Sequence, residues 1–185
     1  MLKYQNFSIR TIDTNDNERI LLWRNSEKVR INMYTDHVIS QLEHSNWFNN
    51  ALIDKSAVYL IFSHEERPIG FISFTNINSY HSRCHWAFYM GENDAPIGAG
   101  SAMEFFALDY AFLTLKIRKL CCEVFTFNTS VVKLHEKFGF VREGLFVGHC
   151  FKNHKYQDVL TLAKFGSEWD AERESLMKRI FGKNI

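Results

Sequence analysis

Two glycines separated by one residue, Gly98 and Gly100, stand directly before an apolar run in the segment DAPIGAGSAMEFFALDYAF. Glycine lets the chain turn sharply, and it also lets a ligand approach the backbone closely. A strand, a glycine-containing loop and a helix are expected to follow one another here, so free N–H groups at the start of the helix could bind a phosphate. A tight strand-to-helix turn that binds nothing is the alternative interpretation.

A second segment, NTSVVKLHEKFGFVREG, follows the next apolar strand-like run. Its Asn128 would end that strand and open a helix, and Gly139 would close the helix in a C′ position. The two segments together resemble the two signatures of the Gcn5-related N-acetyltransferase superfamily. In the first signature, Gln/Arg-x-x-Gly-x-Gly/Ala, both glycines match, while Ala95 stands where Gln or Arg is usual. The residues that match the second signature are Asn128, Glu136, Lys137, Gly139, Phe140, Glu143 and Gly144.

This resemblance implies an N-acetyltransferase with acetyl-CoA as co-substrate and direct transfer in a ternary complex. The glycine loop would hold the pyrophosphate through its backbone, because the usual side-chain contact is missing at Ala95. The acetyl-CoA site is expected to comprise Tyr89, Met90, Ile97, Gly98, Ala99, Gly100, Ser101 and Asn128.

Acetyl transfer from a thioester to an amine requires a neutral amine and a proton for the leaving thiolate. The superfamily usually supplies that proton from a Tyr at the position that His135 occupies here. An imidazolium is a competent acid near neutral pH, so His135 is the predicted general acid. Packing against its apolar neighbours Val131, Leu134 and Phe138 is the alternative role.

Glu123 is expected to lie inside a strand, CCEVF, that is otherwise nearly all apolar. An unpaired carboxylate buried there would be costly, so we expect it to be either functional or part of a buried ion pair. As a functional group it would withdraw the proton of the acceptor amine through water.

The segment LLWRNSEKVRINMYTDHVISQLEHSNWFNN resembles the acetyltransferases of nucleotide-linked aminosugars in pseudaminic acid biosynthesis. The resemblance continues through PIGFISFTNIN, CEVF, KLHEKFGF and YQDV, from about residue 20 to residue 169. It implies that the acceptor is the 4-amino group of a UDP-linked 4-amino-4,6-dideoxy sugar, UDP-4-amino-4,6-dideoxy-N-acetyl-β-L-altrosamine.

The predicted acceptor site consists of Arg24, His44, Trp47, Trp86, Met33, Tyr34 and Phe125. Arg24 and His44 would contact the phosphates, and Trp47 or Trp86 would stack on the uracil. An apolar wall for the 6-deoxy methyl group would come from Met33, Tyr34 and Phe125. Core packing is the alternative for Trp47 and Met33, and an ion pair with Glu18 or Glu27 is the alternative for Arg24.

Three other functions compete with this hypothesis. A protein N-terminal acetyltransferase of the ribosomal-protein type shares the WRN-like helix and both signatures. A polyamine acetyltransferase would need an acceptor pocket richer in acidic residues than the predicted one. A non-catalytic acyl-CoA sensor could have lost the usual Tyr.

The composition limits the partners further. The chain has 185 residues, 46% of them hydrophobic, and a formal net charge of +1 from 22 basic and 21 acidic residues. This balance does not favour nucleic acid or a membrane surface as partner. The N-terminus lacks the apolar core of a signal peptide, so we expect a cytoplasmic protein with reduced cysteines. HSRCH and HCFKNH do not have the spacing of a structural zinc site, and we expect no metal. A homodimer is an open alternative to the monomer.

The elements that must position these residues form one predicted α/β domain over residues 1–185, with a catalytic core over about 7–165 and a helical tail over 166–185. Strands are expected at 7–12, 57–63, 68–77, 84–90, 119–127, 144–151 and 156–163, from β-branched and aromatic runs between polar turns. One helix is expected over 15–30 and a second after the capping box at Ser40 and Glu43. A third should follow Gly100 and a fourth should follow Asn128. The resulting fold is a mixed, mostly antiparallel central sheet flanked by about four helices.

Overall fold

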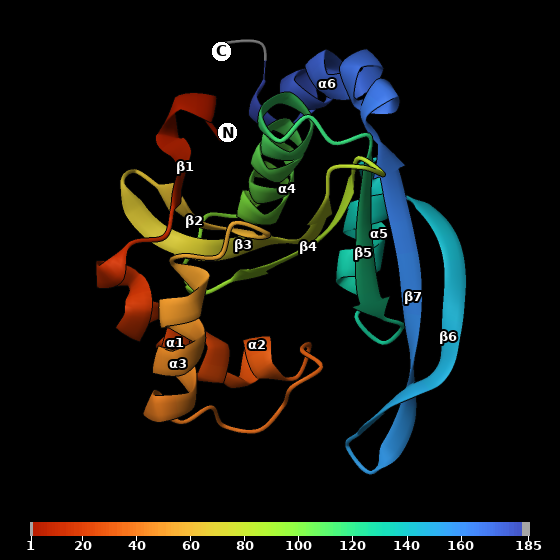
Figure 1. The fold of residues 1–185 in the computed structure, drawn as a ribbon. Coiled ribbons are helices and arrows are strands. Elements are labelled where there is room, and N and C mark those ends of the chain that lie inside the picture. The colour runs from red at the N-terminus through yellow and green to blue at the C-terminus, as the bar shows by residue number, and fades with distance from the viewer. Residues whose placement is uncertain (1, 183–185) are drawn as a thin grey trace.

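A computed structural model describes residues 2–182 and shows one seven-stranded sheet with strand order β1-β2-β3-β4-β5-β7-β6 (Figure 1). The strands are β1 (Phe7–Thr11), β2 (Val58–His64), β3 (Arg67–Asn78), β4 (Arg83–Met90), β5 (Lys119–Phe125), β6 (Val141–Lys152) and β7 (Lys155–Phe165). Only the β4–β5 pair is parallel among these strands. The prediction of a mixed, mostly antiparallel sheet is confirmed.

The described chain has six α-helices rather than about four: α1 (Asn17–Asn25), α2 (Glu27–Arg30), α3 (Gln41–Ala51), α4 (Ala99–Asp109), α5 (Thr129–Lys137) and α6 (Gly166–Phe181). The helix predicted over 15–30 is interrupted at Ser26, which has an extended backbone. The Ser26 hydroxyl donates a hydrogen bond to the Trp23 carbonyl at 2.6 Å, and such bonds compete with helix continuation. The predicted start of α3 is correct, because the Ser40 hydroxyl accepts from the Glu43 N–H.

The helices divide between the two faces of the sheet. On one face, Ile20 and Trp23 of α1 and Phe48 of α3 pack against Ile61 and Phe71 of the sheet. On the other face, α4, α5 and α6 contribute to the larger core, and α4 is buried over most of its circumference. The two faces therefore carry separate packing layers. None of the helices within residues 2–182 is both long and apolar enough to cross a membrane.

The sheet opens at its centre. Strands β4 and β5 pair only over Arg83–His85 and Lys119–Cys121 and then diverge, as the two ribbons do in Figure 1. A backbone that separates in this way leaves peptide groups of both strands free to face a ligand instead of each other. This V-shaped opening is the place where a substrate could enter the sheet.

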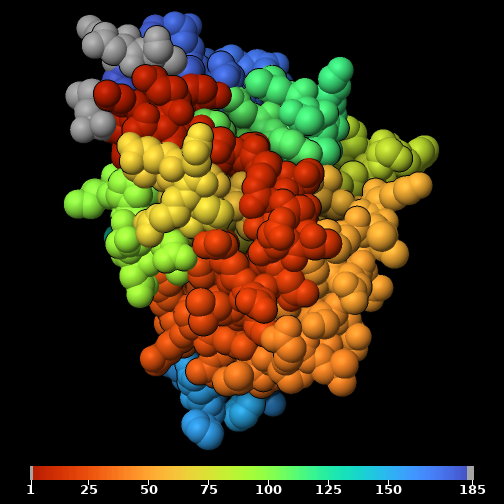
Figure 2. Space-filling model, turned by 90° about the vertical axis from the view of Figure 1, so that its left-hand side faces the viewer, coloured from red at the N-terminus to blue at the C-terminus, as the bar shows by residue number. Residues whose placement is uncertain are grey.

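The β6–β7 hairpin contacts the N-terminal part of the chain near its tip. Its tip projects past α1 and α3 in the turned view of Figure 2. Close to the tip, the buried Lys152 donates to the Met33 carbonyl at 2.9 Å and to the Arg30 carbonyl at 3.3 Å, and its Nζ lies 3.2 Å from Asp36. Lys152 thereby fixes the loop that follows α2.

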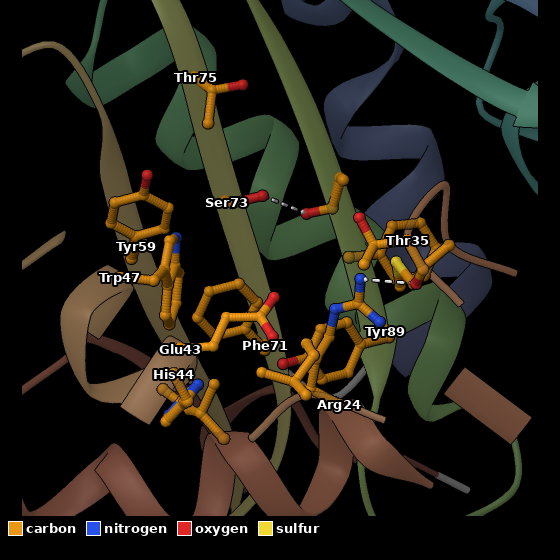
Figure 3. A pocket seen from close by; sticks show the side chains of 15 residues that line it. Arg24, Thr35, Glu43, His44, Trp47, Tyr59, Phe71, Ser73, Thr75 and Tyr89 are labelled. Atoms are coloured by element: carbon orange, nitrogen blue, oxygen red, sulfur yellow. Dashed lines mark hydrogen bonds between the residues drawn. The ribbon is translucent and has the colours of Figure 1, made fainter. Parts of the chain in front are cut away.

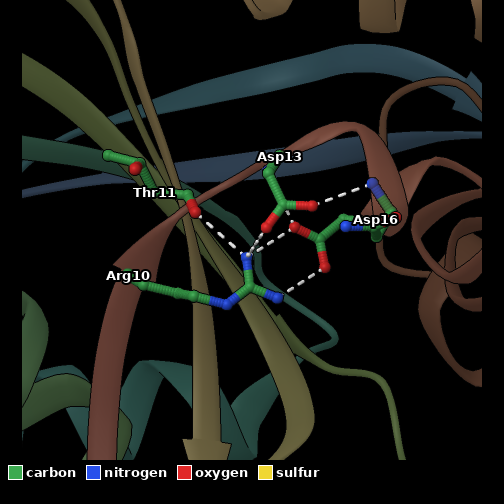
Figure 4. Close-up of polar contacts among 5 residues, drawn as sticks. Arg10, Thr11, Asp13 and Asp16 are labelled. Atoms are coloured by element: carbon green, nitrogen blue, oxygen red, sulfur yellow. Dashed lines mark hydrogen bonds and ion pairs between the residues drawn. The ribbon is translucent and has the colours of Figure 1, made fainter.

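The entry to α1 is held by a compact ionic joint (Figure 4). Arg10 of β1 donates to both carboxylate oxygens of the buried Asp16, at 2.7 and 2.8 Å, and also lies 3.2 Å from Asp13. Burial acts to raise the pKa of Asp16, but the hydrogen bonds from Arg10 and from the Asp13 backbone outweigh it and lower the pKa. The charged joint fixes the angle between β1 and α1.

Candidate active site

A cleft of about 660 Å³ lies at the opening between β4 and β5. Residues from both faces line it, including Met90, Gly100, Glu123, Asn128, Leu134 and His135. The cleft thus joins the start of α4, the start of α5 and the exposed side of β5. It has the size and position of a site for an extended ligand that threads through the sheet.

The start of α4 has the backbone features that a phosphate site needs. Gly98 has φ +90°, a left-handed conformation that favours glycine, and it stands as the N-cap of α4. The N–H groups of Gly98 and Gly100 make no hydrogen bond within the described part of the chain. A Cβ atom at Gly100 would meet only Leu134, at 3.8 Å, so the surface above this residue is open. These features fit a pyrophosphate at the positive end of α4.

The other residues of the predicted acetyl-CoA site are spread around this loop. Met90, Gly100 and Asn128 line the cleft, and Asn128 is the N-cap of α5. Tyr89 also lines the cleft but stacks on Phe71, at 5.2 Å between ring centroids. Gly98, Ala99 and Ser101 form the turn into α4, preceded by Ile97, whose side chain is 99% exposed. Their contacts with acetyl-CoA remain a prediction.

Replacing Gly100 by Val is expected to weaken acetyl-CoA binding by about tenfold, because the new side chain would occupy the open approach to the backbone N–H groups. The same change at Gly98 would strain its left-handed backbone, whereas Gly100 has room for a side chain. Calorimetric titration with acetyl-CoA measures the effect, and Gly100→Ala should give a smaller loss. A folded Gly100→Val protein with wild-type affinity would show that the loop is only a turn.

His135 is buried in the wall of the cleft. Its Nδ1 lies 2.9 Å from Oε1 of Glu104, and both side chains are almost inaccessible, at 2% and 0% exposure. The ring packs among Trp86, Phe88 and Phe140. Burial acts to lower the pKa of His135, but the negative charge of Glu104 outweighs it and raises the pKa to about 10. Glu104 thus favours the proton-bearing form of His135, while burial raises the pKa of Glu104 itself. The role of His135 as general acid stays a prediction.

Glu104 was not singled out from the sequence as a site residue. The available signal was a lone carboxylate within the first turns of an otherwise apolar helix. Such a group needs a partner, but the partner is 31 positions away on α5, and the sequence alone does not show which residues the two helices bring together.

The expectation that Glu123 is buried is wrong. β5 alternates between a buried face with Leu120, Cys122 and Val124 and a face on which Glu123 is exposed. Glu123 accepts a hydrogen bond from the Tyr34 hydroxyl at 2.5 Å and lines the cleft together with Tyr34. Because Glu123 is exposed, water can reach its carboxylate. Its role as the base is still a prediction.

A second pocket, of about 400 Å³, lies between α1, α3 and the sheet face formed by β2, β3 and β4 (Figure 3). Its aromatic walls come from Trp47, Tyr59, Phe71 and Tyr89. The residues that line both this pocket and the cleft are Met33, Thr75, Ala87, Phe88 and Tyr89. The two spaces are thus adjacent and share part of their walls.

Arg24 is the cation of this pocket. It rises from α1 toward Tyr89 and the loop that carries Thr35 (Figure 3), where its Nη2 donates to the Thr35 carbonyl at 3.2 Å. Its Nη1 is buried without a hydrogen-bond partner, and Arg24 forms no ion pair within residues 2–182, neither with Glu18 nor with Glu27. Burial lowers the pKa of this guanidinium. A half-buried cation with an unused donor is suited to an anionic ligand.

Trp47, Met33, Tyr34 and Phe125 have positions consistent with the predicted acceptor site. Trp47 is 37% exposed and meets Tyr59 edge-on at 5.5 Å, which leaves part of its indole open to the pocket. Tyr34 packs against Phe125 at 5.4 Å, and both line the cleft with Met33. These three side chains thus form one stretch of the cleft wall, and their contact with a methyl group stays a prediction.

Two other acceptor residues do not have the expected surroundings. His44 is buried, with Nε2 2.9 Å from the Asn17 carbonyl, and burial lowers its pKa, so it is a neutral link between α3 and α1 rather than a phosphate-binding cation. Trp86 borders the cleft but is only 3% exposed, because its ring packs against Phe88 and Phe140. It therefore has no open ring face on which a uracil could stack.

The known proteins that resemble this chain are acetyltransferases with more than one name. Residues 9–161 match the acetyltransferase (GNAT) domain family. The chain is 29% identical over 137 residues to acetyltransferase PseH of Campylobacter jejuni, which covers 74% of this chain and 83% of PseH. It is 30% identical over 101 residues to the spermidine N(1)-acetyltransferase of Vibrio cholerae, which covers 55% of this chain and 58% of that enzyme.

The crystal structure of spermidine N-acetyltransferase from Vibrio cholerae in complex with CoA and spermine has a TM-score of 0.84 to this chain. It covers 89% of this chain and 98% of its own, at 23% sequence identity, and so shows the shared fold alone. A dodecameric structure of the same enzyme has a TM-score of 0.77, at 24% identity, over 89% of this chain and 96% of its own.

Proposed function

This chain belongs to the acetyltransferase (GNAT) family and is an N-acetyltransferase, and we propose that its acceptor is the 4-amino group of a UDP-linked 4-amino-4,6-dideoxy sugar. The likeness to PseH supports a place in pseudaminic acid biosynthesis, with UDP-4-amino-4,6-dideoxy-N-acetyl-β-L-altrosamine as the substrate.

The single observation that carries the proposal is the unpaired guanidinium of Arg24 in the smaller pocket. A diphosphate offers two anionic groups to such a donor, and the open part of Trp47 offers a flat surface for uracil. From there the sugar would extend past Met33 into the cleft, where the 4-amino group would meet the acetyl group.

Polyamine acetylation is the second candidate, because spermidine acetyltransferases also match the chain. A polyamine is a polycation and would need carboxylates where this pocket has Arg24. Glu43 is the carboxylate among the described residues that line this pocket, and its Oε2 lies 3.0 Å from Nε2 of His37. The pocket thus holds one cation and one carboxylate, and the unused donor of Arg24 is the feature that favours an anionic acceptor.

The proposed chemistry needs acetyl-CoA, which supplies an acetyl group activated as a thioester. The backbone N–H groups of Gly98 and Gly100 would bind the pyrophosphate. Glu123 would accept the proton of the acceptor ammonium through water, and His135 would donate a proton to the sulfur as the carbon–sulfur bond breaks. The neutral amine attacks the acetyl carbon directly in a ternary complex.

A thiol-release assay with acetyl-CoA tests the acceptor. We expect a UDP-4-amino-4,6-dideoxy sugar to give a much higher kcat/KM than spermidine or a peptide with a free amino terminus. Free UDP should compete with the sugar and not with acetyl-CoA. If spermidine or the peptide is acetylated efficiently and every 4-amino UDP-sugar is ignored, the acceptor is wrong, although the acetyltransferase activity stands.

A further inference from the structure

The carboxylate of Glu104 lies in the interior of the larger core, where a charge is expensive. Its side chain is 0% exposed, and its Oε2 has no hydrogen-bond partner within the described chain. Replacing a buried ion pair by apolar side chains is often neutral or stabilising, so packing alone does not account for Glu104 and His135. The pair also lies at the wall of the cleft, because His135 lines it.

The geometry divides the imidazole ring into two sides. Nδ1 faces Glu104 at 2.9 Å, which leaves Nε2 as the other ring nitrogen, and His135 lines the cleft together with Cys122. A proton on Nδ1 is held by the carboxylate, so the proton that can leave is the one on Nε2. In a Ser-His-Asp triad a buried carboxylate fixes the tautomer and orientation of a histidine in the same way.

We propose that Glu104 is the positioning residue of the acetyl transfer: it fixes the ring of His135 through Nδ1 and holds it as an imidazolium whose Nε2 proton is directed to the leaving sulfur. The inference rests on the proposed role of His135 as general acid. As the carbon–sulfur bond breaks, its electron pair stays on sulfur. The Nε2–H bond then breaks and an S–H bond forms. Neutral His135 regains a proton from water before the next turnover.

Burial raises the pKa of Glu104, against the charges of His135 and of the nearby Lys164, which act to lower it. Lys164 of β7, 0% exposed, lies 2.9 Å from Glu172 and 4.0 Å from Glu168 of α6. Cys122 of β5 is the remaining titratable group beside His135. Lys164 therefore has its own carboxylates, and Glu104 supplies the negative charge that faces the imidazolium.

Glu104→Gln tests the proposal, because it keeps a hydrogen-bond acceptor for Nδ1 and removes the charge. The first readout is the pKa of His135 by NMR titration, with its signal assigned by its loss in a His135 variant. We expect this pKa to fall, since the negative charge of Glu104 is lost and burial, which acts to lower the pKa, is then opposed by Cys122 without Glu104. The second readout is the pH profile of kcat with whichever acceptor the wild-type enzyme uses. The alkaline limb should move to lower pH by a similar amount, and kcat should recover as pH falls.

Asp109→Asn is the matched control, since Asp109 is the other acid of α4 and is also paired, with Arg173 and Trp169. It should lower Tm and leave both readouts unchanged. Glu104→Asp, which keeps the charge, should restore part of kcat and keep the pKa high; it also serves if Glu104→Gln does not fold.

An unchanged pKa of His135 in Glu104→Gln would overturn the inference, as would a lowered pKa with an unchanged pH profile of kcat. Because the NMR titration needs no acceptor, a lowered pKa in a protein that ignores all UDP-sugars would count against the proposed acceptor and not against Glu104.

Discussion

His135→Phe is expected to lower kcat by about 10²- to 10⁴-fold, the usual contribution of a positioned proton donor. The phenyl ring keeps approximate bulk among Trp86, Phe88 and Phe140 but carries no proton for the leaving sulfur. Acetyl-CoA affinity should change little, because the predicted pyrophosphate contacts lie at the start of α4. Steady-state kinetics together with calorimetric titration separate the two effects.

The variant leaves Glu104 buried without its partner, which costs about 3–5 kcal/mol in comparable pairs. His135→Phe combined with Glu104→Leu removes both charges and should restore stability without restoring activity. His135→Tyr should retain measurable turnover, since Tyr is the usual residue at this position of the family. Near wild-type kcat in a folded His135→Phe protein would return His135 to a packing role.

Arg24→Met is expected to raise the KM for the UDP-sugar by about 10- to 100-fold, because a hydrogen bond to a charged group contributes about 1.5–3 kcal/mol. The substitution keeps much of the side chain's apolar stem and removes the guanidinium from the smaller pocket. Acetyl-CoA affinity should remain unchanged, since Arg24 is not among the residues that line the cleft. Kinetics with each substrate varied in turn measure both quantities.

Arg19→Met is the matched control for this change. Arg19 lies on the same helix, but it is exposed and its guanidinium is 5.9 Å from the centroid of the Trp23 ring, outside the pocket. Its substitution should leave the KM for the sugar unchanged. If Arg24→Met binds the sugar as well as wild type does, the guanidinium does not contact the phosphates and the proposed orientation of the acceptor is wrong.

Local patterns in the sequence were enough to predict most of the fold. Apolar and β-branched runs predicted the seven strands, and the hydroxyl of Ser40 marked the start of α3. The break at Ser26 was missed, because a serine within a helical pattern can either continue the helix or bond back to the preceding turn. The environment of the side chain decides between these two outcomes.

Less of the candidate site could be predicted from the sequence. The glycine loop and the Asn128 segment are motifs contiguous in sequence, so they could be recognised directly. The surroundings of Glu123, His44 and Trp86 depend on which face of each element meets which neighbour. Successive residues of a strand point to opposite faces of the sheet, so Glu123 is exposed although both of its neighbours in the chain are buried. The contact between His44 and the carbonyl of Asn17 joins two helices that are separated in the sequence. Contacts of this kind depend on packing rather than on composition.

The short parallel pairing of β4 with β5 also affects how the protein resists unfolding. Strands β1 to β4 form one ribbon of antiparallel neighbours and β5 to β7 another, and within the sheet only three residue pairs join the two ribbons. Hydrogen bonding between strands is sparsest at the seam between the ribbons, and we expect local opening of the sheet to begin there. A molecule bound in the cleft contacts both ribbons, and its binding free energy adds to the cost of separating them. Acetyl-CoA bound at the proposed site would therefore add to the cohesion of the sheet as well as take part in the reaction.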